Sequence, residues 1–269
     1  MQTIILIIFL IPVMWLLAVR GRTGHEGMTA LYNWAYAHRG LHGDGVPENS
    51  MAAFRKAKES GYGIEFDVHL LSDGDLAVIH DSKLKRTTGA EGKIEDLTAA
   101  QLTKYNLEGT DETIPLFSQV LELYNGEAPL IIELKASGNN IEALCRKACD
   151  MMAGYSGPYC MESFDPRCVR WLRKNRPDVI RGQLTENYFA SATSIIPAVL
   201  KFILRHQLLN FLTLPDFVAY RFADRKTFSN FMVQKIWKLS GVTWTLKTPD
   251  EYEIAVKEGW IPIFENFRP

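Results

Sequence analysis

Four short polar motifs occur at the ends of apolar stretches, and each contains residue types that can do chemistry. They are HR at 38–39, EFD at 65–67, HD at 80–81 and ELK at 133–135. Residues two apart on a β-strand point to the same side, so Glu65 and Asp67 share one face of their strand. In a barrel of parallel strands, the carboxyl ends of the strands form the functional face. We therefore expect these motifs to meet at one site.

Three of these residues carry carboxylates that are suited to hold a cation. Glu65 and Asp67 lie on a strand that is predicted to be interior, where an unpaired pair of carboxylates is costly. A divalent cation offsets this cost, and both Mg²⁺ and Ca²⁺ take oxygen ligands. Glu133, on the next long apolar strand, is the natural third ligand.

Two histidines and two basic side chains complete the set. A lone histidine is more often structural than catalytic, but His38 and His80 each end an apolar strand beside a charged residue. Imidazoles transfer protons, and the side chains of Arg39 and Lys135 bind anions. An ordinary surface position is the alternative interpretation of Lys135. Together with a cation, the inventory suits the cleavage of a phosphate ester.

The rest of the sequence alternates short apolar runs with helical patterns. Predicted strands cover 35–38, 63–68, 76–80, 130–134, 158–162, 179–184, 216–220, 241–245 and 261–264. Predicted helices cover 50–60, 96–105, 115–125, 139–153, 165–175, 225–239 and 249–258. This alternation predicts parallel strands with right-handed crossovers. The length of 269 residues fits one barrel, which typically needs about 250 residues.

Two segments depart from this alternation. Residues 82–97 are rich in Gly, Thr and charged residues, which predicts an insertion. Residues 189–214 are unusually apolar for a connection. They are interpreted either as an amphipathic helix that faces the core or as an interfacial segment that lies on a bilayer.

The N-terminal segment predicts a membrane anchor. Residues 1–19 contain no charged side chain, and as a helix they would reach roughly 28 Å, close to the hydrocarbon thickness of a bilayer. A cleaved signal peptide is the alternative, but a basic n-region and a small-x-small cleavage site are not evident. We expect an uncleaved single-pass anchor. Arg20 and Arg22, which follow it, predict that the catalytic domain faces the cytoplasm.

The overall composition argues against nucleic acid as a partner. The chain has 30 Lys and Arg against 31 Asp and Glu, a formal net charge of −1. This balance gives no electrostatic bias towards a polyanion. The cysteines, at 145, 149, 160 and 168, form no CxxC pair and have no histidine at zinc-finger spacing. Buried free thiols in a reducing compartment are expected.

The motifs and their order closely resemble the glycerophosphodiester phosphodiesterase family. AHRG, PENS and AF are followed by IEFDVHLLSDGDLAVIHD, IPLFSQVL and LIIELK. ESFDP at 162–166, GVTWTLKTPDE at 241–251 and ENF at 265–267 extend the resemblance, which runs from about residue 35 to 267. It implies a (β/α)8 TIM barrel that hydrolyses glycerophosphodiesters to sn-glycerol 3-phosphate and an alcohol.

The expected domain organisation combines this resemblance with the N-terminal segment. A transmembrane anchor at 1–20 and a linker at 21–34 precede the barrel at 35–269. The segment 82–112 resembles the small subdomain that the family carries beside its barrel.

The resemblance also implies roles for individual residues. His38 and His80 match the acid and base, and Glu65, Asp67 and Glu133 match the ligands of one divalent cation, Mg²⁺ or Ca²⁺.

Four further positions match residues around the substrate. Arg39 and Lys135 match phosphate-facing residues of the family, and Glu48 matches a glutamate near the site. Trp244 resembles an aromatic residue near the glycerol pocket. Ser50 stands where the family usually has Thr, a mild change at a helix N-cap.

Several alternatives stay open. The attacking group is water or the glycerol 2-hydroxyl, and either histidine can be the acid. A lysophospholipase D-type enzyme that acts on membrane lipids is favoured by the anchor and by residues 189–214. A membrane-tethered binding protein without turnover would need a damaged catalytic set, and the motifs are intact.

Overall fold

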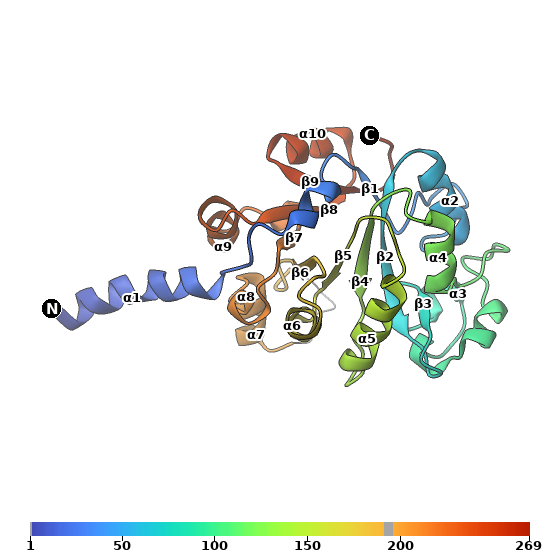
Figure 1. The fold of residues 1–269 in the computed structure, drawn as a ribbon, viewed down its shortest axis with the longest axis horizontal. Helices are drawn as coiled ribbons and strands as arrows, with labels where there is room; N and C mark the ends of the chain where they lie inside the picture. Colours follow the sequence, from blue (N-terminus) through green and yellow to red (C-terminus); the bar gives the residue numbers. More distant parts are fainter. Residues whose placement is uncertain (1, 191–195) are drawn as a thin grey trace.

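The fold is a closed barrel of parallel strands. The computed structural model describes residues 2–190 and 196–269, with side chains from residue 10 onwards. Within these residues, the strands follow one another around the barrel in the order β1, β2, β4, β5, β6, β7, β8, β9 (Figure 1). The ring closes because β1 pairs in parallel with both β2 and β9. The barrel expected from the sequence is confirmed.

The barrel strands are short, and their bounds lie within a few residues of the predicted runs. They are β1 (Tyr36–His38), β2 (Gly63–Leu70), β4 (Leu130–Leu134), β5 (Tyr159–Ser163), β6 (Arg181–Thr185), β7 (Phe217–Arg221), β8 (Ser240–Leu246) and β9 (Trp260–Phe264). Nearly all of their residues are buried, as expected for strands that face side chains in the barrel and helices outside it.

Helices cover the outside of the barrel (Figure 1). They are α2 (Met51–Glu59), α4 (Phe117–Tyr124), α5 (Ile141–Met152), α6 (Pro166–Asn175), α7 (Ala198–Arg205), α8 (Asn210–Thr213), α9 (Phe228–Phe231) and α10 (Pro249–Lys257). Helix α9 continues directly into the π-helical turn η5 (Met232–Ile236). Side-chain caps mark where four of these helices begin, namely α2, α6, α9 and α10. The Ser50 hydroxyl accepts a hydrogen bond from the Ala53 amide at 3.1 Å, and Thr248 accepts one from the Glu251 amide at 3.2 Å.

The run predicted as a strand at 76–80 is not part of the barrel. It forms β3 (Leu76–Val78), which pairs antiparallel with the far end of β2. The connection at 71–75 is a tight turn, with Gly74 at a φ of 85°, and is too short for the dozen or so residues that a parallel crossover needs. The chain therefore rises on β2 and returns on β3. The Ile79 amide then bonds the Asp67 carbonyl at 3.2 Å, so that His80 comes back to the barrel rim.

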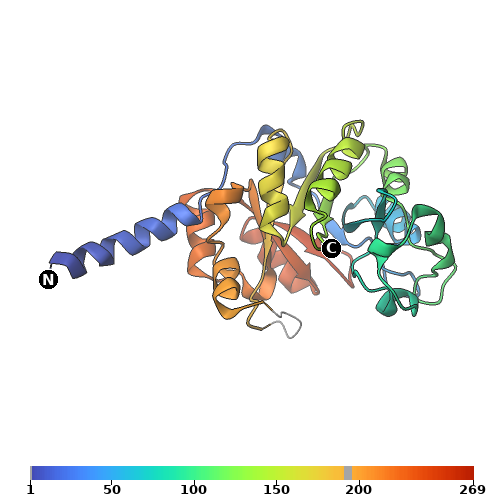
Figure 2. The same ribbon diagram turned by 90° about the horizontal axis from the view of Figure 1, so that it is seen from below.

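The insertion after β3 forms a small lobe with its own apolar centre. It contains α3 (Lys85–Thr88) and the 3₁₀ turns η2 (Ile94–Asp96) and η3 (Ala99–Lys104). Buried side chains that include Leu84, Ile94 and Leu102 pack with residues of the β2–β3 hairpin. The lobe lies at the end of the molecule opposite the N-terminus (Figure 2).

Residues 21–34, predicted as a linker, close the amino end of the barrel. The 3₁₀ turn η1 (Glu26–Leu31) buries Met28 and Leu31 in the same apolar cluster as the barrel-interior side chains. Arg22 forms an ion pair with Asp216. The division of the chain at residues 20 and 34 stays a prediction, but the packing shows that η1 belongs to the core of the barrel.

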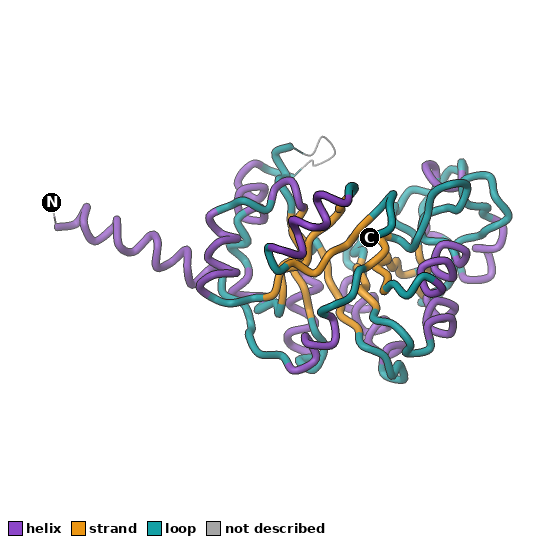
Figure 3. The backbone as a smooth tube through the Cα atoms, turned by 90° about the horizontal axis from the view of Figure 1, so that it is seen from above, coloured by secondary structure: helices purple, strands orange, loops and turns teal. Residues whose placement is uncertain are grey.

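The N-terminal helix α1 (Gln2–Ala18) extends away from the barrel (Figure 3). Its end is held, where Trp15 Nε1 donates to Ser229 Oγ at 2.9 Å and Trp237 Nε1 donates to the Leu16 carbonyl at 2.8 Å. Among the described residues, no helix has both the length and the apolar character to cross a membrane. The predicted membrane-spanning anchor is therefore not confirmed.

The apolar segment at 189–214 forms two short helices rather than one. Residues 191–195 lie outside the described residues, and α7 and α8 follow. α7 has no buried residue, and Val199 is 72% exposed. The interpretation of this segment as a helix that faces the core is therefore wrong for α7.

Candidate active site

Strand register brings the three predicted cation ligands together. Asp67 on β2 is the pairing partner of Glu133 on β4, and Glu65 on β2 is the partner of His38 on β1. Glu65, Asp67 and Glu133 are all buried, and one oxygen from each lies within 4.8 Å of the others. The spacing of two residues within EFD and the adjacency of β2 and β4 are together sufficient to build this cluster.

The three carboxyls differ in their electrostatics. Burial raises the pKa of Glu65 well above its usual range, and the charge of Asp67 adds to the rise. Burial also raises the pKa of Glu133. For Asp67, burial acts in the same direction, but Lys135 and the other positive groups around it hold the pKa of its carboxyl well below its usual range. A divalent cation would favour the ionised form of all three, so the set fits such an ion.

A fourth carboxylate, Glu162, lies beside this cluster and was not singled out from the sequence. It is the pairing partner of Glu133 on β5 and is 1% exposed. Burial raises the pKa of Glu162 well above its usual range, with the charge of Glu133 adding to the effect. Its Oε2 atom is buried without a hydrogen-bond partner, which is rare in proteins. The sequence did contain a signal for Glu162, because ESFDP places this acid near the end of its strand, as EFD and ELK place their acidic residues.

Two cationic side chains border the carboxylates. Lys135 Nζ lies 2.7 Å from Glu133 Oε1 and 3.0 Å from Asp67 Oδ1. Arg39 Nε lies 3.4 Å from Asp67 Oδ2. Burial opposes the charge of Lys135, but the carboxylates of Asp67 and Glu133 outweigh it and raise the pKa of its ammonium group. Both cations therefore remain charged at the edge of the cluster.

Glu48 does not contact the carboxylate cluster but joins two arginines. Its Oε1 atom lies 2.9 Å from Arg39 Nη1 and 2.7 Å from Arg86 Nη2. Arg86 comes from α3 in the insertion and also pairs with Asp81. Glu48 therefore connects the loop after β1 to the insertion and fixes the guanidinium of Arg39.

His38 is held by a residue from the last strand of the barrel. Its Nδ1 atom lies 2.8 Å from Glu265 Oε2, and its Nε2 atom lies 3.8 Å from Glu65 Oε2. Burial lowers the pKa of His38, although the hydrogen bond with Glu265 opposes this. That hydrogen bond lowers the pKa of Glu265 to about 2. With Nδ1–H donated to Glu265, a neutral His38 keeps a lone pair on Nε2, which faces the carboxylates.

His80 reaches the same rim from the returning strand β3. Its Nδ1 atom lies 2.6 Å from Asp81 Oδ1. The hydrogen bond from His80 lowers the pKa of Asp81 far below its usual range, and Arg86 adds to the effect. The Asp81 side chain is thus a charged partner that orients the ring.

Two cavities adjoin the site, and Glu133 of the carboxylate cluster lines one of them. One, of about 680 Å³, is lined by His80, Glu133 and Lys135, by Ser163 and Phe164, and by Lys83 of the insertion, among others. The other, of about 540 Å³, is lined by His38, Arg39, Arg221, Trp244, Lys247 and Glu265, among others. The Trp244 ring packs edge-on against Phe164, with centroids 5.5 Å apart. Each histidine therefore faces its own cavity.

The family assignment follows from comparison with known proteins. The sequence model of the Glycerophosphoryl diester phosphodiesterase family matches residues 38–267. This range holds every strand of the barrel except part of β1 and includes the complete carboxylate cluster. The chain belongs to the glycerophosphodiester phosphodiesterase family.

Curated relatives match a part of the chain. A glycerophosphodiester phosphodiesterase of Bacillus altitudinis is 44% identical over 107 residues, which are 37% of this chain and 43% of the relative. The Lysophospholipase D GDPD1 of Rattus norvegicus is 34% identical over 132 residues, or 44% of this chain and 40% of the relative. The chain thus matches less than half the length of either protein.

Solved structures have the same fold. A phosphodiesterase of Oleispira antarctica, solved in complex with the product sn-glycerol-3-phosphate, superposes with a TM-score of 0.71 at 20% sequence identity. The superposition covers 91% of this chain and 95% of that one. This chain and that distant protein therefore share the same fold.

Proposed function

We propose that the protein hydrolyses glycerophosphodiesters to sn-glycerol 3-phosphate and an alcohol with the help of one divalent cation. The observation that carries this proposal is the buried cluster of Glu65, Asp67 and Glu133, together with one cavity lined by His80 and Lys135 and another lined by His38 and Arg39. Membership in the glycerophosphodiester phosphodiesterase family supports the same reaction.

Glu65, Asp67 and Glu133 would hold the cation, and Glu162, whose Oε2 atom has no hydrogen-bond partner, lies next to them. Their all-oxygen donor set is the one that Mg²⁺ and Ca²⁺ prefer. Such an ion supplies Lewis-acid polarisation of a phosphoryl oxygen when it is bound. The side chains of Arg39 and Lys135 bind the remaining phosphoryl oxygens and offset the charge that grows on them.

The two cavities suggest which histidine is the general base and which is the general acid. Trp244 lines the cavity of His38, and its resemblance to the aromatic residue near the glycerol pocket puts glycerol on that side. His38 then takes the proton of the attacking hydroxyl through Nε2, whether this belongs to water or to the glycerol 2-position. The alcohol leaves through the larger cavity, where His80 gives it a proton. The lysines of the insertion border the leaving alcohol.

A turnover assay tests the proposal. Native protein with Mg²⁺ or Ca²⁺ should release sn-glycerol 3-phosphate from glycerophosphocholine, and EDTA should abolish the release. The Glu65→Ala variant should lose activity by orders of magnitude while remaining folded. Turnover that resists EDTA and survives in Glu65→Ala would contradict the assignment, as would the absence of turnover on every diester tried.

A second candidate substrate is a lysophospholipid in a membrane. The relative from Rattus norvegicus is a lysophospholipase D, and the described part of the protein exposes large apolar side chains on α1, α7, α9 and the turn that follows α9. We define this apolar face as the exposed residues Leu10, Met14, Leu17, Val199, Phe202, Phe228, Phe231 and Ile236. Trp15 of α1 stacks edge-on against Phe202 of α7, with ring centroids 5.8 Å apart, and donates a hydrogen bond to Ser229 of α9 at 2.9 Å, so α1 is a neighbour of both helices.

We also propose that the apolar face attaches the protein to a bilayer, with the barrel on the cytoplasmic side. The segments that carry the face are rich in basic residues, which include Lys201, Arg205, Lys235 and Lys238, and such residues favour an anionic surface. Native protein should sediment with vesicles that contain anionic lipid, and Phe231→Asp should weaken this binding. A comparison of lysophosphatidylcholine with glycerophosphocholine in the assay above separates the two substrate classes.

A further inference from the structure

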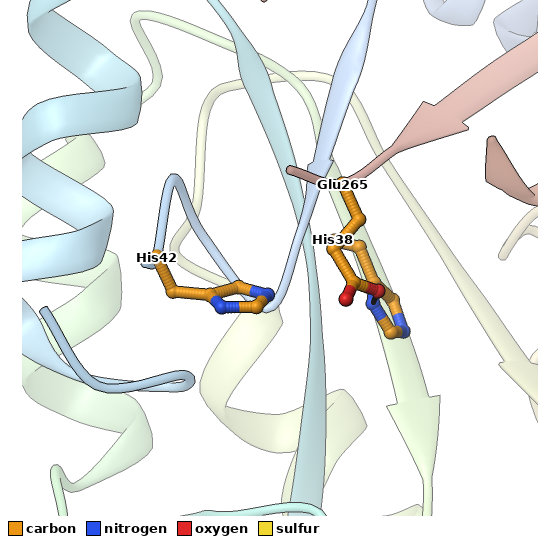
Figure 4. A group of neighbouring side chains, drawn as sticks. All are labelled: His38, His42 and Glu265. Carbon is orange, nitrogen blue, oxygen red and sulfur yellow. Dashed lines mark hydrogen bonds and ion pairs between the residues drawn. The ribbon is translucent and has the colours of Figure 1, made fainter. Parts of the chain in front are cut away.

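A second group of possible metal ligands lies next to the carboxylate cluster. His38, His42 and Glu265 each offer one ligand atom, and these atoms lie within 4.8 Å of one another. His38 ends β1, His42 lies in the loop that follows it, and Glu265 follows β9. In Figure 4 the His42 ring points towards the paired side chains of His38 and Glu265.

An unpartnered nitrogen supports the presence of a ligand at this group. The Nε2 atom of His42 is buried and has no hydrogen-bond partner. Buried side-chain nitrogens are nearly always bonded, so such an exception calls for an explanation such as an ion. The cavity that His38 and Glu265 line gives access from solvent.

The donor set differs in kind from that of the carboxylate cluster. Glu65, Asp67 and Glu133 offer only oxygen, which suits Mg²⁺ and Ca²⁺, whereas two imidazoles and one carboxylate suit a transition-metal ion such as Zn²⁺. Zinc sites with two histidines, one glutamate and an open fourth position are well known. Two neighbouring sites in one protein would thus select different ions.

The three side chains need to move only slightly to reach the geometry of a tetrahedral metal site. Bonds of 2.0–2.1 Å in a tetrahedral arrangement place ligand atoms about 3.3 Å apart. The Nδ1 atom of His38 and the Oε2 atom of Glu265 lie 2.8 Å apart, and no ligand atom is more than 4.8 Å from the others. His42 lies in a loop, where a shift of its ring is least constrained.

We propose that His38, His42 and Glu265 form a second metal site that binds Zn²⁺, and that the bound Zn²⁺ inhibits the enzyme. The ion takes the place of the Nδ1 proton of His38, and Nε2 takes up one proton through solvent, so that the ring stays neutral and no net proton is released. The ring of a metal-bound neutral imidazole then carries its proton on Nε2, so this atom has no lone pair with which to accept the proton of the attacking hydroxyl. The inhibition rests on the proposed role of His38 in turnover, whereas the metal site itself does not.

Binding is measured without turnover. The full chain, saturated with Mg²⁺, is titrated with Co²⁺, which reports tetrahedral nitrogen and oxygen ligands by its visible absorption, and Zn²⁺ is then used to displace the Co²⁺. We expect one such site. His42→Gln should weaken Zn²⁺ binding by more than the roughly 10–100-fold that changes around a metal's ligands produce, and the distant His25→Gln should leave it unchanged. Equal Zn²⁺ affinity in His42→Gln and native protein would overturn the site.

Inhibition is measured on the same variants. Zn²⁺ should inhibit native protein and His25→Gln at saturating Mg²⁺, while His42→Gln should keep its basal activity and resist Zn²⁺. Equal inhibition of His42→Gln would show that Zn²⁺ acts by displacing Mg²⁺ from Glu65, Asp67 and Glu133, and activation by Zn²⁺ would also contradict the proposal. If native protein turns over no diester, the proposed function fails, but the Co²⁺ titration still decides whether the site exists.

Discussion

Glu265 Oε2 lies 2.8 Å from His38 Nδ1, so a residue at the end of the last barrel strand holds the imidazole at the end of the first. The contact exists because β1 and β9 are hydrogen-bonded neighbours in the closed barrel. It fixes the tautomer of His38 and leaves Nε2 facing Glu65. We therefore regard Glu265 as a positioning residue for the reaction.

Loss of this carboxylate should reduce kcat more than it changes KM. Glu265→Gln keeps an oxygen acceptor for the Nδ1 proton of His38 but removes the charge, so we expect kcat to fall by about 10–100-fold, as for partners of other functional imidazoles. Glu265→Ala should lower kcat further, because it also removes the oxygen acceptor. Steady-state kinetics measure kcat and KM of each variant. The control is Glu253→Gln, a substitution at an exposed position of α10. Unchanged kcat in Glu265→Ala would contradict the positioning role.

Removal of the cation should make stability depend on pH. The pKa of Glu65 is raised in the folded state, so its contribution to stability is fully present below the ordinary glutamate value of about 4.3 and is lost as the pH rises through the folded value. A bound cation removes this loss. The rise in Tm on addition of Mg²⁺ or Ca²⁺ should therefore be larger at about pH 8 than at about pH 5.5.

The matched variants for this prediction are Glu65→Gln and the exposed Glu91→Gln. Glu91→Gln should behave as native protein does. In Glu65→Gln the metal-free protein should be more stable than native protein at the higher pH, because a like charge is gone from beside Asp67. A cation-induced rise in Tm that is the same at both pH values in native protein would contradict the electrostatic account.

Two glycines of the first loop should differ sharply on substitution. Gly40 and Gly45 have almost the same backbone conformation, with φ of 79° and 80°. A Cβ on Gly40 would lie 2.8 Å from Ala53 Cβ, whereas a Cβ on Gly45 would meet nothing within 4 Å. Gly45→Ala should cost only the left-handed strain of about 1–2 kcal/mol, and Gly40→Ala should cost clearly more. Denaturant unfolding of both variants measures this, and equal losses would contradict the close packing of α2 on this loop.

Much of the site was predictable because strand periodicity and motif order specify it. The pattern EFD puts Glu65 and Asp67 on one face of a strand, and the barrel brings Glu133 beside them. The antiparallel direction of β3 was harder to foresee, because the run at 76–80 is as apolar as a barrel strand and only the short turn before it distinguishes the two.

Contacts between distant segments were less predictable. The pairing of His38 with Glu265 joins the two ends of the barrel, and the position of His42 depends on the path of one loop. Likewise, η1 looks like a polar linker in the sequence, and only the closed barrel creates the apolar opening that Met28 and Leu31 fill. Such contacts depend on tertiary structure and leave no local signal.

The most direct test of the proposed mechanism compares leaving groups in the two histidine variants. His38→Ala and His80→Ala should each lose about 10²–10⁴-fold in kcat on glycerophosphocholine. With a p-nitrophenyl diester, whose leaving group needs no proton, His80→Ala should recover most of its activity and His38→Ala should not. If the two variants lose the same activity on both substrates, or if His38→Ala is the one rescued, the assignment of His38 as base and His80 as acid is wrong.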